Sequence, residues 1–283
     1  MTDTARLYRL AAFSDDPAGG NRAGVWIGRH LPEGQVMQQI AAEVGYSETA
    51  FVAPAEGFDR RIRYYSPLAE VSFCGHATIA TGVVLGRTHG PGAYRLDSAV
   101  GNIALDVSCP GNTISATLTS VPTRFEPADK VMLLAILETL GWHRQELDRR
   151  IPPAVAYAGA RHLVLAARTK DRLDRLEYAF EALKALMKEH GLTTLQLIWR
   201  ESDSVIHSRN PFPVGGVVED AATGAAAAAL GGYLRDAGIL KAPFEFLVRQ
   251  GEVMGRPSRL EVSVPQEGGV AVTGTAVAIS DPA

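Results

Sequence analysis

The stretch Val71–Gly86, which reads VSFCGHATIATGVVLG, decides the fold of this chain. From Gly75 onward its residues are small or apolar, and a helix with almost no polar face is expected to be buried on all sides. A second stretch of the same kind, AATGAAAAALGGYL at Ala221–Leu234, lies in the other half of the chain. Both are shorter than the ~18 apolar residues that a membrane span needs. We therefore predict two buried helices, at 75–86 and at about 223–234.

The entries of these two helices, Cys74 and Asp220, are separated by about half of the 283 residues. Short strand-like segments surround each helix in the same order. Such spacing suggests a duplicated unit in which strands enclose one apolar helix. We predict an α+β fold of two lobes with a cleft between them, divided into residues 1–120 and 121–283, with the final strands able to pack back on the first lobe.

Other elements follow from periodicity and from glycine and proline signals. A helix with Val36, Ile40 and Val44 on one face is predicted to end at Gly45. An amphipathic helix is predicted over 171–189, and the segment 121–127, with two prolines, is predicted to be a connector. Strands are predicted at 7–12, 24–27, 49–53, 61–65, 94–97, 102–108 and 113–119, and again at 195–199, 205–207, 244–249, 260–264 and 270–273.

Composition and charge exclude several classes of protein. The chain is 46% hydrophobic and 21% charged with a formal net charge of −3, so it has no basic field for nucleic acid or an anionic membrane. Two cysteines make no disulfide framework, and a cytoplasmic protein is the expectation. Phosphate-loop, dinucleotide, zinc-protease and serine-hydrolase motifs are absent, and the seven histidines do not pair at metal-ligand spacing. We expect no cofactor and no metal, with helix N-termini supplying a positive field instead.

Two groups of residues in the first half could carry chemistry. In SETAFV, Glu48 lies between a helix-ending glycine and an apolar strand, where a carboxylate can point into a cleft and act as a base or an acid. The alternative is a solvated glutamate at a turn. In SFCGHAT, Cys74, Gly75 and His76 open the buried helix, whose first N–H groups favour an anion and activate a thiol. The alternatives are a core cysteine and a histidine bonded to backbone.

A third group lies in the second half, where EDAATGA places Asp220 directly before the other small-residue helix. An acid at this point is most simply an N-cap. The functional interpretation is an acid that faces the cleft from the second lobe, opposite Glu48 and Cys74. Two helix N-termini that converge on one point would bind a small carboxylate without a metal.

Five segments together resemble the PhzF-like phenazine-biosynthesis isomerase family. They are GNRAG at 20–24, SETAFV at 47–52, RYYSPLAEVSFCGHAT at 63–78, EDAATGAAA at 219–227 and QGEVMGRPS at 250–258. The match runs in order from about Phe13 to Ile279. The resemblance implies the diaminopimelate epimerase-like fold, with two pseudo-symmetric lobes that are each a β-barrel-like sheet wrapped around a central buried helix.

The resemblance also implies a function. It is a cofactor-independent isomerase that moves a proton on a small carboxylate-bearing substrate in the interlobe cleft, and that forms a homodimer without nucleic-acid or membrane partners. The residues that match the family's catalytic positions are Glu48, His76 and Asp220. The residues expected to bind substrate are Asn21, Ser47, Cys74, Gly75, Thr223 and Gly224.

Some positions depart from the family pattern. Arg22 and Ala221 stand where the family usually has proline, and Ala225 stands where it has serine, which removes a hydroxyl from the expected pocket wall. The physiological substrate and its pathway therefore stay open. Related epimerases use two cysteines as opposed bases, so a racemase that uses Cys74 and Asp220 is one alternative. A non-catalytic ligand-binding protein that retains the cleft is another.

Overall fold

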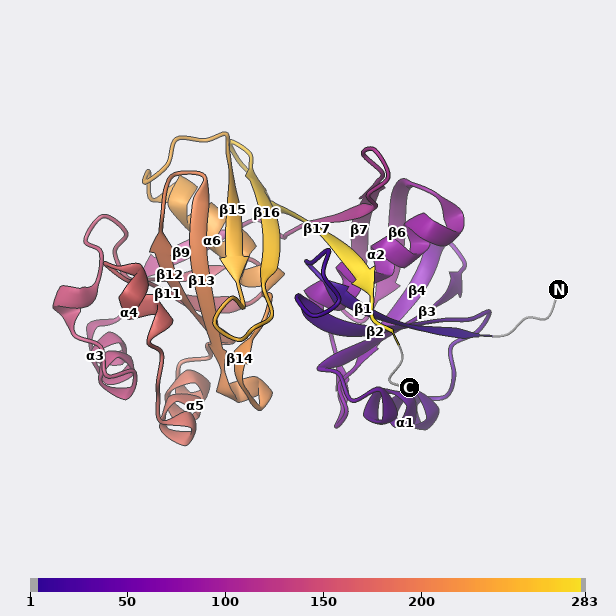
Figure 1. The fold of residues 1–283 in the computed structure, drawn as a ribbon, viewed down its shortest axis with the longest axis horizontal. Helices are drawn as coiled ribbons and strands as arrows, with labels where there is room; N and C mark the ends of the chain where they lie inside the picture. The colour runs from indigo at the N-terminus through magenta and orange to yellow at the C-terminus, as the bar shows by residue number, and fades with distance from the viewer. Residues whose placement is uncertain (1–4, 281–283) are drawn as a thin grey trace. The chain divides into compact units, whose positions relative to one another are not determined.

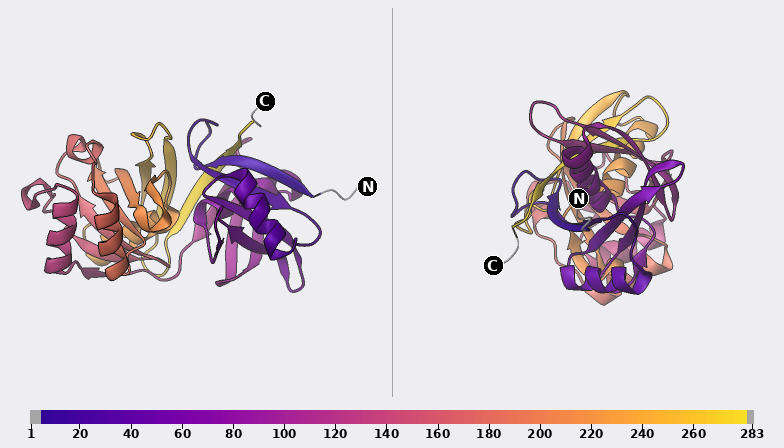
Figure 2. Two further views of the ribbon diagram at one scale, coloured as in Figure 1. Left: turned by 90° about the horizontal axis from the view of Figure 1, so that it is seen from below. Right: turned by 90° about the vertical axis from the view of Figure 1, so that its right-hand side faces the viewer.

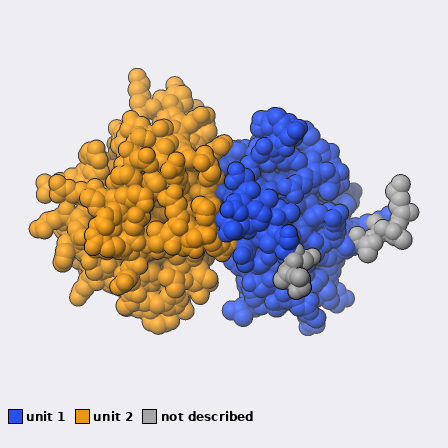
Figure 3. All heavy atoms as spheres, viewed as in Figure 1, with its two compact units in different colours: residues 1–119, 273–283 blue, residues 120–272 orange. Residues whose placement is uncertain are grey.

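In the computed structural model, which describes residues 5–280, the chain divides into two compact units (Figure 3). Unit 1 comprises residues 1–119 and 273–283, and unit 2 comprises residues 120–272. The last strand, β17 (Ala271–Ala278), pairs with β1 (Arg6–Ala12), with Leu10 opposite Ala278. Unit 1 is therefore built from both ends of the chain.

Unit 1 is a closed barrel of strands. Besides β1 and β17 its strands are β2 (Asn21–Ile27), β3 (Glu48–Ala55), β4 (Phe58–Tyr65), β6 (Gly92–Ser98), β7 (Gly101–Ser108) and β8 (Ser115–Thr119). The pairings run β17–β1–β2–β3–β4–β6–β7–β8 and return to β17, and the short β5 (Glu70–Val71) adds to β4. The pairs β2–β3 and β4–β6 are parallel. Closure gives every strand of this ring two neighbours, so the ring has no free edge.

The interior of this barrel is filled by α2 (Gly75–His89), which begins where the small-residue stretch predicts and runs one turn further. Its residues from His76 to Gly86 are all buried, and it contacts β1, β2, β3, β7 and β8. The packing is close because two positions lack a side chain. A Cβ atom at Gly82 would lie 2.6 Å from the Cβ of Ala116, and one at Gly86 would lie 2.7 Å from Cγ2 of Ile114.

A second helix of unit 1, α1 (Gly34–Val44), lies outside the ring of strands (Figures 1 and 2). Its Met37 and Ala41 pack against Phe51 of β3 and Tyr65 of β4. It ends at Gly45, whose φ of 68° is the left-handed conformation that glycine adopts without strain. The chain then turns directly into β3, so this end of the helix determines where β3 starts.

Unit 2 repeats the arrangement around a second helix, α6 (Gly224–Asp236). Its strands are β9 (Arg124–Pro127), β10 (Ala154–Tyr157), β11 (Arg161–Ala166), β12 (Thr194–Arg200), β13 (Val205–Phe212), β14 (Val217–Asp220), β15 (Phe244–Gln250) and β16 (Ser258–Val264). The parallel pairs β11–β12 and β13–β15 correspond to β2–β3 and β4–β6 of unit 1. Residues 226–234 of α6 are buried. The predicted fold class, two similar α+β units with a helix buried among strands, is confirmed.

The outer face of unit 2 is covered by α3 (Lys130–Thr139) and α5 (Phe180–Glu189), with short 3-10 turns η1 (Arg144–Glu146) and η2 (Pro213–Gly215). The sequence patterns did not indicate α3. Its N-cap is Asp129, whose carboxylate accepts from the N–H groups of Val131 and Met132. Within residues 5–280, no helix combines the length and the apolar character needed to cross a membrane.

The predicted helix over 171–189 is wrong, because two helices occupy that segment, α4 (Lys170–Asp174) and α5. The guanidinium of Arg209 on β13 donates from Nη1 to the carbonyl oxygen of Asp174 at 2.7 Å. A continuous helix would need that oxygen for the N–H four residues later. The hydroxyl of Tyr178 donates to the carbonyl of Val218. These tertiary hydrogen bonds favour a non-helical conformation for residues 175–179. The sequence periodicity indicates which residues are apolar on one face, but it does not indicate such an interruption.

The predicted connector at 121–127 is wrong in its second half, which forms β9. This strand pairs antiparallel with β10, with Phe125 opposite Ala156. Proline is tolerated where a strand ends, and Pro127 is the last residue of β9. Its pairing partner lies about 30 residues further along the chain, so local composition alone did not indicate a strand.

We expect Gly82→Ala to destabilise the protein by about 1–3 kcal/mol, the usual cost of overpacking a core. The new methyl would meet Ala116 at 2.6 Å and Leu105 at 3.1 Å. Helix propensity alone predicts that Gly82→Ala makes the protein more stable, since alanine is favoured over glycine in a helix by about 1 kcal/mol. Chemical denaturation decides between the two. The control is Gly34→Ala, where the nearest atom to a new Cβ is the Tyr65 hydroxyl at 3.5 Å. An unchanged or more stable Gly82→Ala protein would contradict the close packing of α2.

Candidate active site

The first residues of β2, β3 and α2 meet at one end of the unit 1 barrel. β2 and β3 are parallel neighbours with Ala23 opposite Glu48, so Asn21 and Glu48 lie at the same end of adjacent strands. Cys74 is the N-cap residue of α2. The N–H groups of a first helical turn have no partner within the helix, so this end carries a partial positive charge. Asn21, Glu48 and Cys74, which come from three separate segments of the sequence, are thus brought to the beginning of one buried helix.

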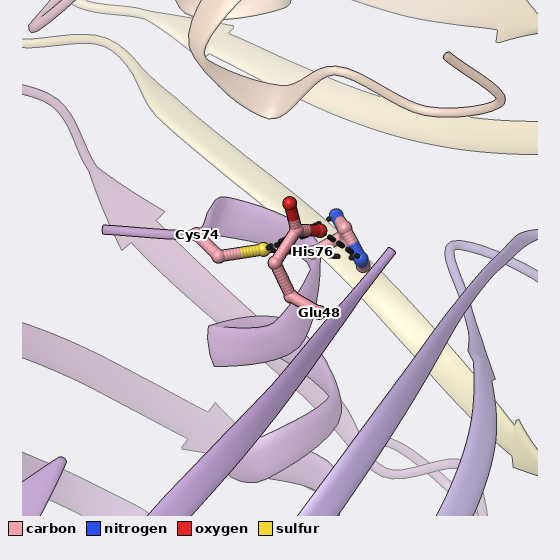
Figure 4. A group of neighbouring side chains, drawn as sticks. All are labelled: Glu48, Cys74 and His76. Atoms are coloured by element: carbon pink, nitrogen blue, oxygen red, sulfur yellow. Dashed lines mark hydrogen bonds and ion pairs between the residues drawn. The ribbon is translucent and has the colours of Figure 1, made fainter. Parts of the chain in front are cut away.

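Three side chains point toward one another at this position, Glu48, Cys74 and His76 (Figure 4). The Cys74 Sγ lies 3.5 Å from Oε2 of Glu48 and 3.4 Å from Nδ1 of His76. The Nε2 of His76 lies 3.4 Å from the same Oε2 atom. Both Cys74 and His76 are buried, whereas the Glu48 side chain keeps 19% of its surface exposed. Glu48 is therefore the member of the cluster that solvent or a ligand reaches most easily.

The ring of His76 is held by two further polar side chains. The Nδ2 of Asn21 lies 3.2 Å from Nδ1, and the Oγ of Ser47 lies 3.3 Å from Nε2. An amide nitrogen can only donate, so Nδ1 accepts and the neutral ring carries its proton on Nε2. That proton faces Ser47 and the Glu48 carboxylate. Asn21, predicted to bind substrate, is itself buried and contacts the histidine.

A hydrogen-bonded pair beneath the cluster fixes the backbone of Cys74. The hydroxyl of Thr78 donates to the carbonyl of Cys74 at 2.7 Å and accepts from the hydroxyl of Tyr64 at 2.6 Å. Burial raises the pKa of Tyr64 well above its ordinary value, so this phenol keeps its proton and remains a donor. These two hydrogen bonds therefore hold the backbone of the N-cap residue in place.

The same cluster offers three different metal ligands, a carboxylate oxygen, a thiol sulfur and an imidazole nitrogen. These ligand atoms all lie within 4.8 Å of one another. The spacing of residues along the chain did not indicate this grouping, because Glu48 comes from β3 and the other two from the start of α2. The expectation that the chain needs no metal stays a prediction.

Asp220 belongs to unit 2, at the end of β14. Its Oδ2 accepts from the hydroxyl of Thr223 at 2.6 Å, and Thr223 is the N-cap residue of α6, which starts at Gly224. The buried Gln250 side chain donates to the Asp220 carbonyl at 2.8 Å and to the Thr223 hydroxyl at 3.0 Å, and it accepts from the Thr223 N–H at 3.2 Å. Asp220 thus orders the N-cap residue and is not the N-cap itself.

The predicted site residues fall into two groups. Asn21, Ser47, Glu48, Cys74, Gly75 and His76 lie together in unit 1, and Asp220, Thr223 and Gly224 lie together in unit 2. Gln250 was not among the predicted residues, although it begins the QGEVMGRPS segment. The side chain of Gln250 contacts Asp220 and Thr223, which are far from it in the sequence, and no local sequence pattern indicates such a contact.

The departures from the family pattern lie around these groups and not within the cluster. Arg22 is exposed, on the face of β2 opposite to Asn21, and its Cζ lies 5.9 Å from the centre of the Tyr46 ring. Ala221 is buried beside the start of α6, and Ala225 lies in the first turn of that helix. The contacts among Glu48, Cys74 and His76 involve none of the three.

Comparisons with known proteins place the chain among related sequences. A profile for phenazine biosynthesis-like proteins (PhzC-PhzF) matches residues 10–281. An uncharacterized isomerase of Escherichia coli, YddE, is 31% identical, with 96% of this chain and 95% of the relative covered. A trans-2,3-dihydro-3-hydroxyanthranilate isomerase of Pseudomonas fluorescens is 31% identical, with 88% of this chain and 86% of the relative covered.

Solved structures agree with this result. A PhzF-family phenazine biosynthesis protein of Bacillus anthracis superposes with a TM-score of 0.85 at 25% identity, covering 99% of this chain and 98% of that one. A probable proline racemase of Agrobacterium radiobacter has a TM-score of 0.67 at 14% identity, covering 99% of this chain and 93% of that one. The second likeness concerns the fold alone. Together they confirm the predicted epimerase-like fold class.

We expect nitrogen NMR to show that neutral His76 is protonated on Nε2 and not on Nδ1, because Asn21 donates to Nδ1. Asn21→Asp replaces that donor with an acceptor and should move a proton onto Nδ1. His162, whose Nδ1 lies 2.8 Å from the Thr194 hydroxyl in unit 2, is the internal control and should not change. A wild-type His76 with its proton on Nδ1 would contradict this arrangement.

Proposed function

The chain belongs to the phenazine biosynthesis-like (PhzC-PhzF) family, and we propose that it is an isomerase that moves a proton on a small carboxylate-bearing substrate, with Glu48 as base and acid. Relatives in this comparison carry isomerase names, including the trans-2,3-dihydro-3-hydroxyanthranilate isomerases of two Pseudomonas species. A carboxylate-bearing substrate of that class is the first compound to test.

One observation carries the proposal, namely that the Glu48 carboxylate is partly exposed while two side chains that can donate lie against the same oxygen. The His76 Nε2 lies 3.4 Å and the Cys74 Sγ 3.5 Å from Oε2. In the metal-free protein both groups face that oxygen with a hydrogen. They orient the carboxylate and leave its other oxygen for the substrate. Geometry of this kind suits a base that removes a proton from one carbon and returns it to another.

The remaining residues support binding of the substrate. The first N–H groups of α2 favour an anion, so the substrate carboxylate belongs near Gly75. Proton transfer to a bound substrate needs a fixed base, and the contacts of His76 with Asn21 and Ser47 limit the motion of the ring that holds Glu48. In this proposal Asp220 acts on the same substrate as an acid–base or binding group.

Glu48→Gln should lower kcat by about 10²–10⁴, the usual contribution of a general base. The amide is nearly isosteric but cannot take up and return a proton. Turnover is measured in deuterium oxide by mass spectrometry. The measurement detects deuterium in a product whose hydrogen has moved to another carbon. Thermal denaturation of both proteins shows whether the variant keeps its fold.

Cys74→Ala separates the isomerase from the racemase. The isomerase proposal predicts a much smaller loss than for Glu48→Gln, whereas an opposed-base racemase needs a group on each face of the inverted carbon. Cys109→Ser is the matched control, since Cys109 is exposed and lies outside the cluster. A folded Glu48→Gln protein with near-normal turnover, beside an inactive Cys74→Ala protein, would overturn the proposal. Binding of small amino or hydroxy acids without turnover of any of them would favour the non-catalytic alternative.

Asp220→Asn should lower kcat/KM by about 10²-fold or more if the carboxylate takes part in proton transfer. The asparagine can still accept from the Thr223 hydroxyl, so the local structure around α6 is expected to survive. Asp203→Asn on an exposed turn is the control. A kcat/KM equal to that of the wild type would limit Asp220 to its structural contact with Thr223.

A further inference from the structure

The three ligand atoms of the cluster lie at distances that also suit a bound metal ion, and the contact between His76 and Glu48 is longer than an ordinary hydrogen bond. An N–H···O bond in a protein is usually 2.7–3.2 Å long, but the His76 Nε2 and Glu48 Oε2 atoms are 3.4 Å apart. The Cys74 Sγ lies 3.5 Å from that oxygen and 3.8 Å from Nε2. These three distances are the edges of a triangle whose corners are one oxygen, one sulfur and one nitrogen.

The same triangle fits one face of a zinc tetrahedron. Zinc binds nitrogen and oxygen at about 2.0–2.2 Å and sulfur at about 2.3 Å, so tetrahedral ligands are separated by roughly 3.4–3.6 Å. The observed edges lie close to that range without any movement of the backbone. Three protein ligands that leave a fourth position open are the usual number in an accessible zinc site.

We propose that a thiophilic divalent cation, with Zn²⁺ as the type case, binds reversibly to Glu48 Oε2, Cys74 Sγ and His76 Nε2, and that it inhibits the protein by occupying the base. The binding rests on the geometry of the cluster alone. The inhibition rests on the proposed function, because a cation on Oε2 withdraws electron density from the Glu48 carboxylate and makes its other oxygen a much weaker base toward carbon.

Asn21 can support both states of the histidine. Without metal its Nδ2 donates to Nδ1, and the ring proton is on Nε2. Metal binding needs the Nε2 lone pair, so the proton moves to Nδ1, and rotation of the amide by half a turn presents Oδ1 as its acceptor. The thiol proton of Cys74 leaves for the solvent as the S–Zn bond forms. Binding of the ion as a thiolate complex therefore releases the thiol proton.

Cobalt(II) is the probe, since it takes the same tetrahedral ligands as zinc and a cobalt–thiolate bond gives a charge-transfer band in the near ultraviolet. We expect one equivalent to give this band in the wild type and Zn²⁺ to abolish it by displacement. Cys109→Ser should bind like the wild type, because Cys109 is outside the cluster. Cys74→Ser should lose the band, and Glu48→Gln should bind Co²⁺ more weakly by more than about 100-fold, beyond the 10–100-fold cost of losing an outer-shell partner. Asn21→Leu should fall within that smaller range.

A band that persists in Cys74→Ser and vanishes in Cys109→Ser would assign the ion to the exposed thiol of Cys109 and would overturn the proposed metal site. The absence of any band with one equivalent of Co²⁺ would overturn it as well. The catalytic rate tests the inhibition separately.

Protein treated with a chelator should convert substrate at the full rate, and added Zn²⁺ should lower that rate in parallel with its displacement of Co²⁺. Loss of turnover on chelation that Zn²⁺ restores would replace inhibition with a requirement for the metal. If the chelator-treated protein shows no turnover but gives the band when Co²⁺ is added, the proposed function is wrong and the metal site is still supported.

Discussion

The α2 helix is enclosed by the strands of its own barrel, and this enclosure constrains the rest of unit 1. A helix with strands around it has room only for small or well-fitted side chains, which is why Gly82 and Gly86 face β7, β8 and the residue before β8 at distances that a methyl group would violate. The helix can be reached only at its ends. Its N-terminus is therefore the natural place for chemistry, since unpaired N–H groups and a partial positive charge come to the surface there.

The parallel pairing of β2 with β3 determines which side chains reach that end. Because the two strands run in the same direction, Asn21 and Glu48 both lie at their first residues, beside Cys74 and His76. Unit 2 has the same parallel pairings and the same kind of helix, yet the start of α6 carries Asp220, Thr223 and Gln250, which bond to one another. The duplicated fold thus supplies two similar helix ends, and the side chains at each end decide its chemistry.

The Glu48 cluster combines groups that compete for the same lone pairs. The carboxylate that we propose as the base, the imidazole beside it and the thiol that faces both can also be three ligands of one ion. The two uses exclude each other at any moment, since a lone pair binds either a proton or a metal. Asn21 is central to both because its amide can donate or accept, and its burial holds it against the ring in either case.

Much of the fold could be predicted from the sequence. The small-residue stretches predicted both buried helices, and Gly45 predicted the end of α1. The sequence by itself determined these features because the apolar pattern of a buried helix and the glycine at a helix end are local properties of the chain. Only the tertiary structure decided that Glu48 contacts Cys74 and His76, that Gln250 joins Asp220 to Thr223, and that Arg209 interrupts the helix over 171–189. Each of these depends on strand register or on a hydrogen bond to a distant segment, and periodicity records how deeply a residue is buried but not which partner it meets.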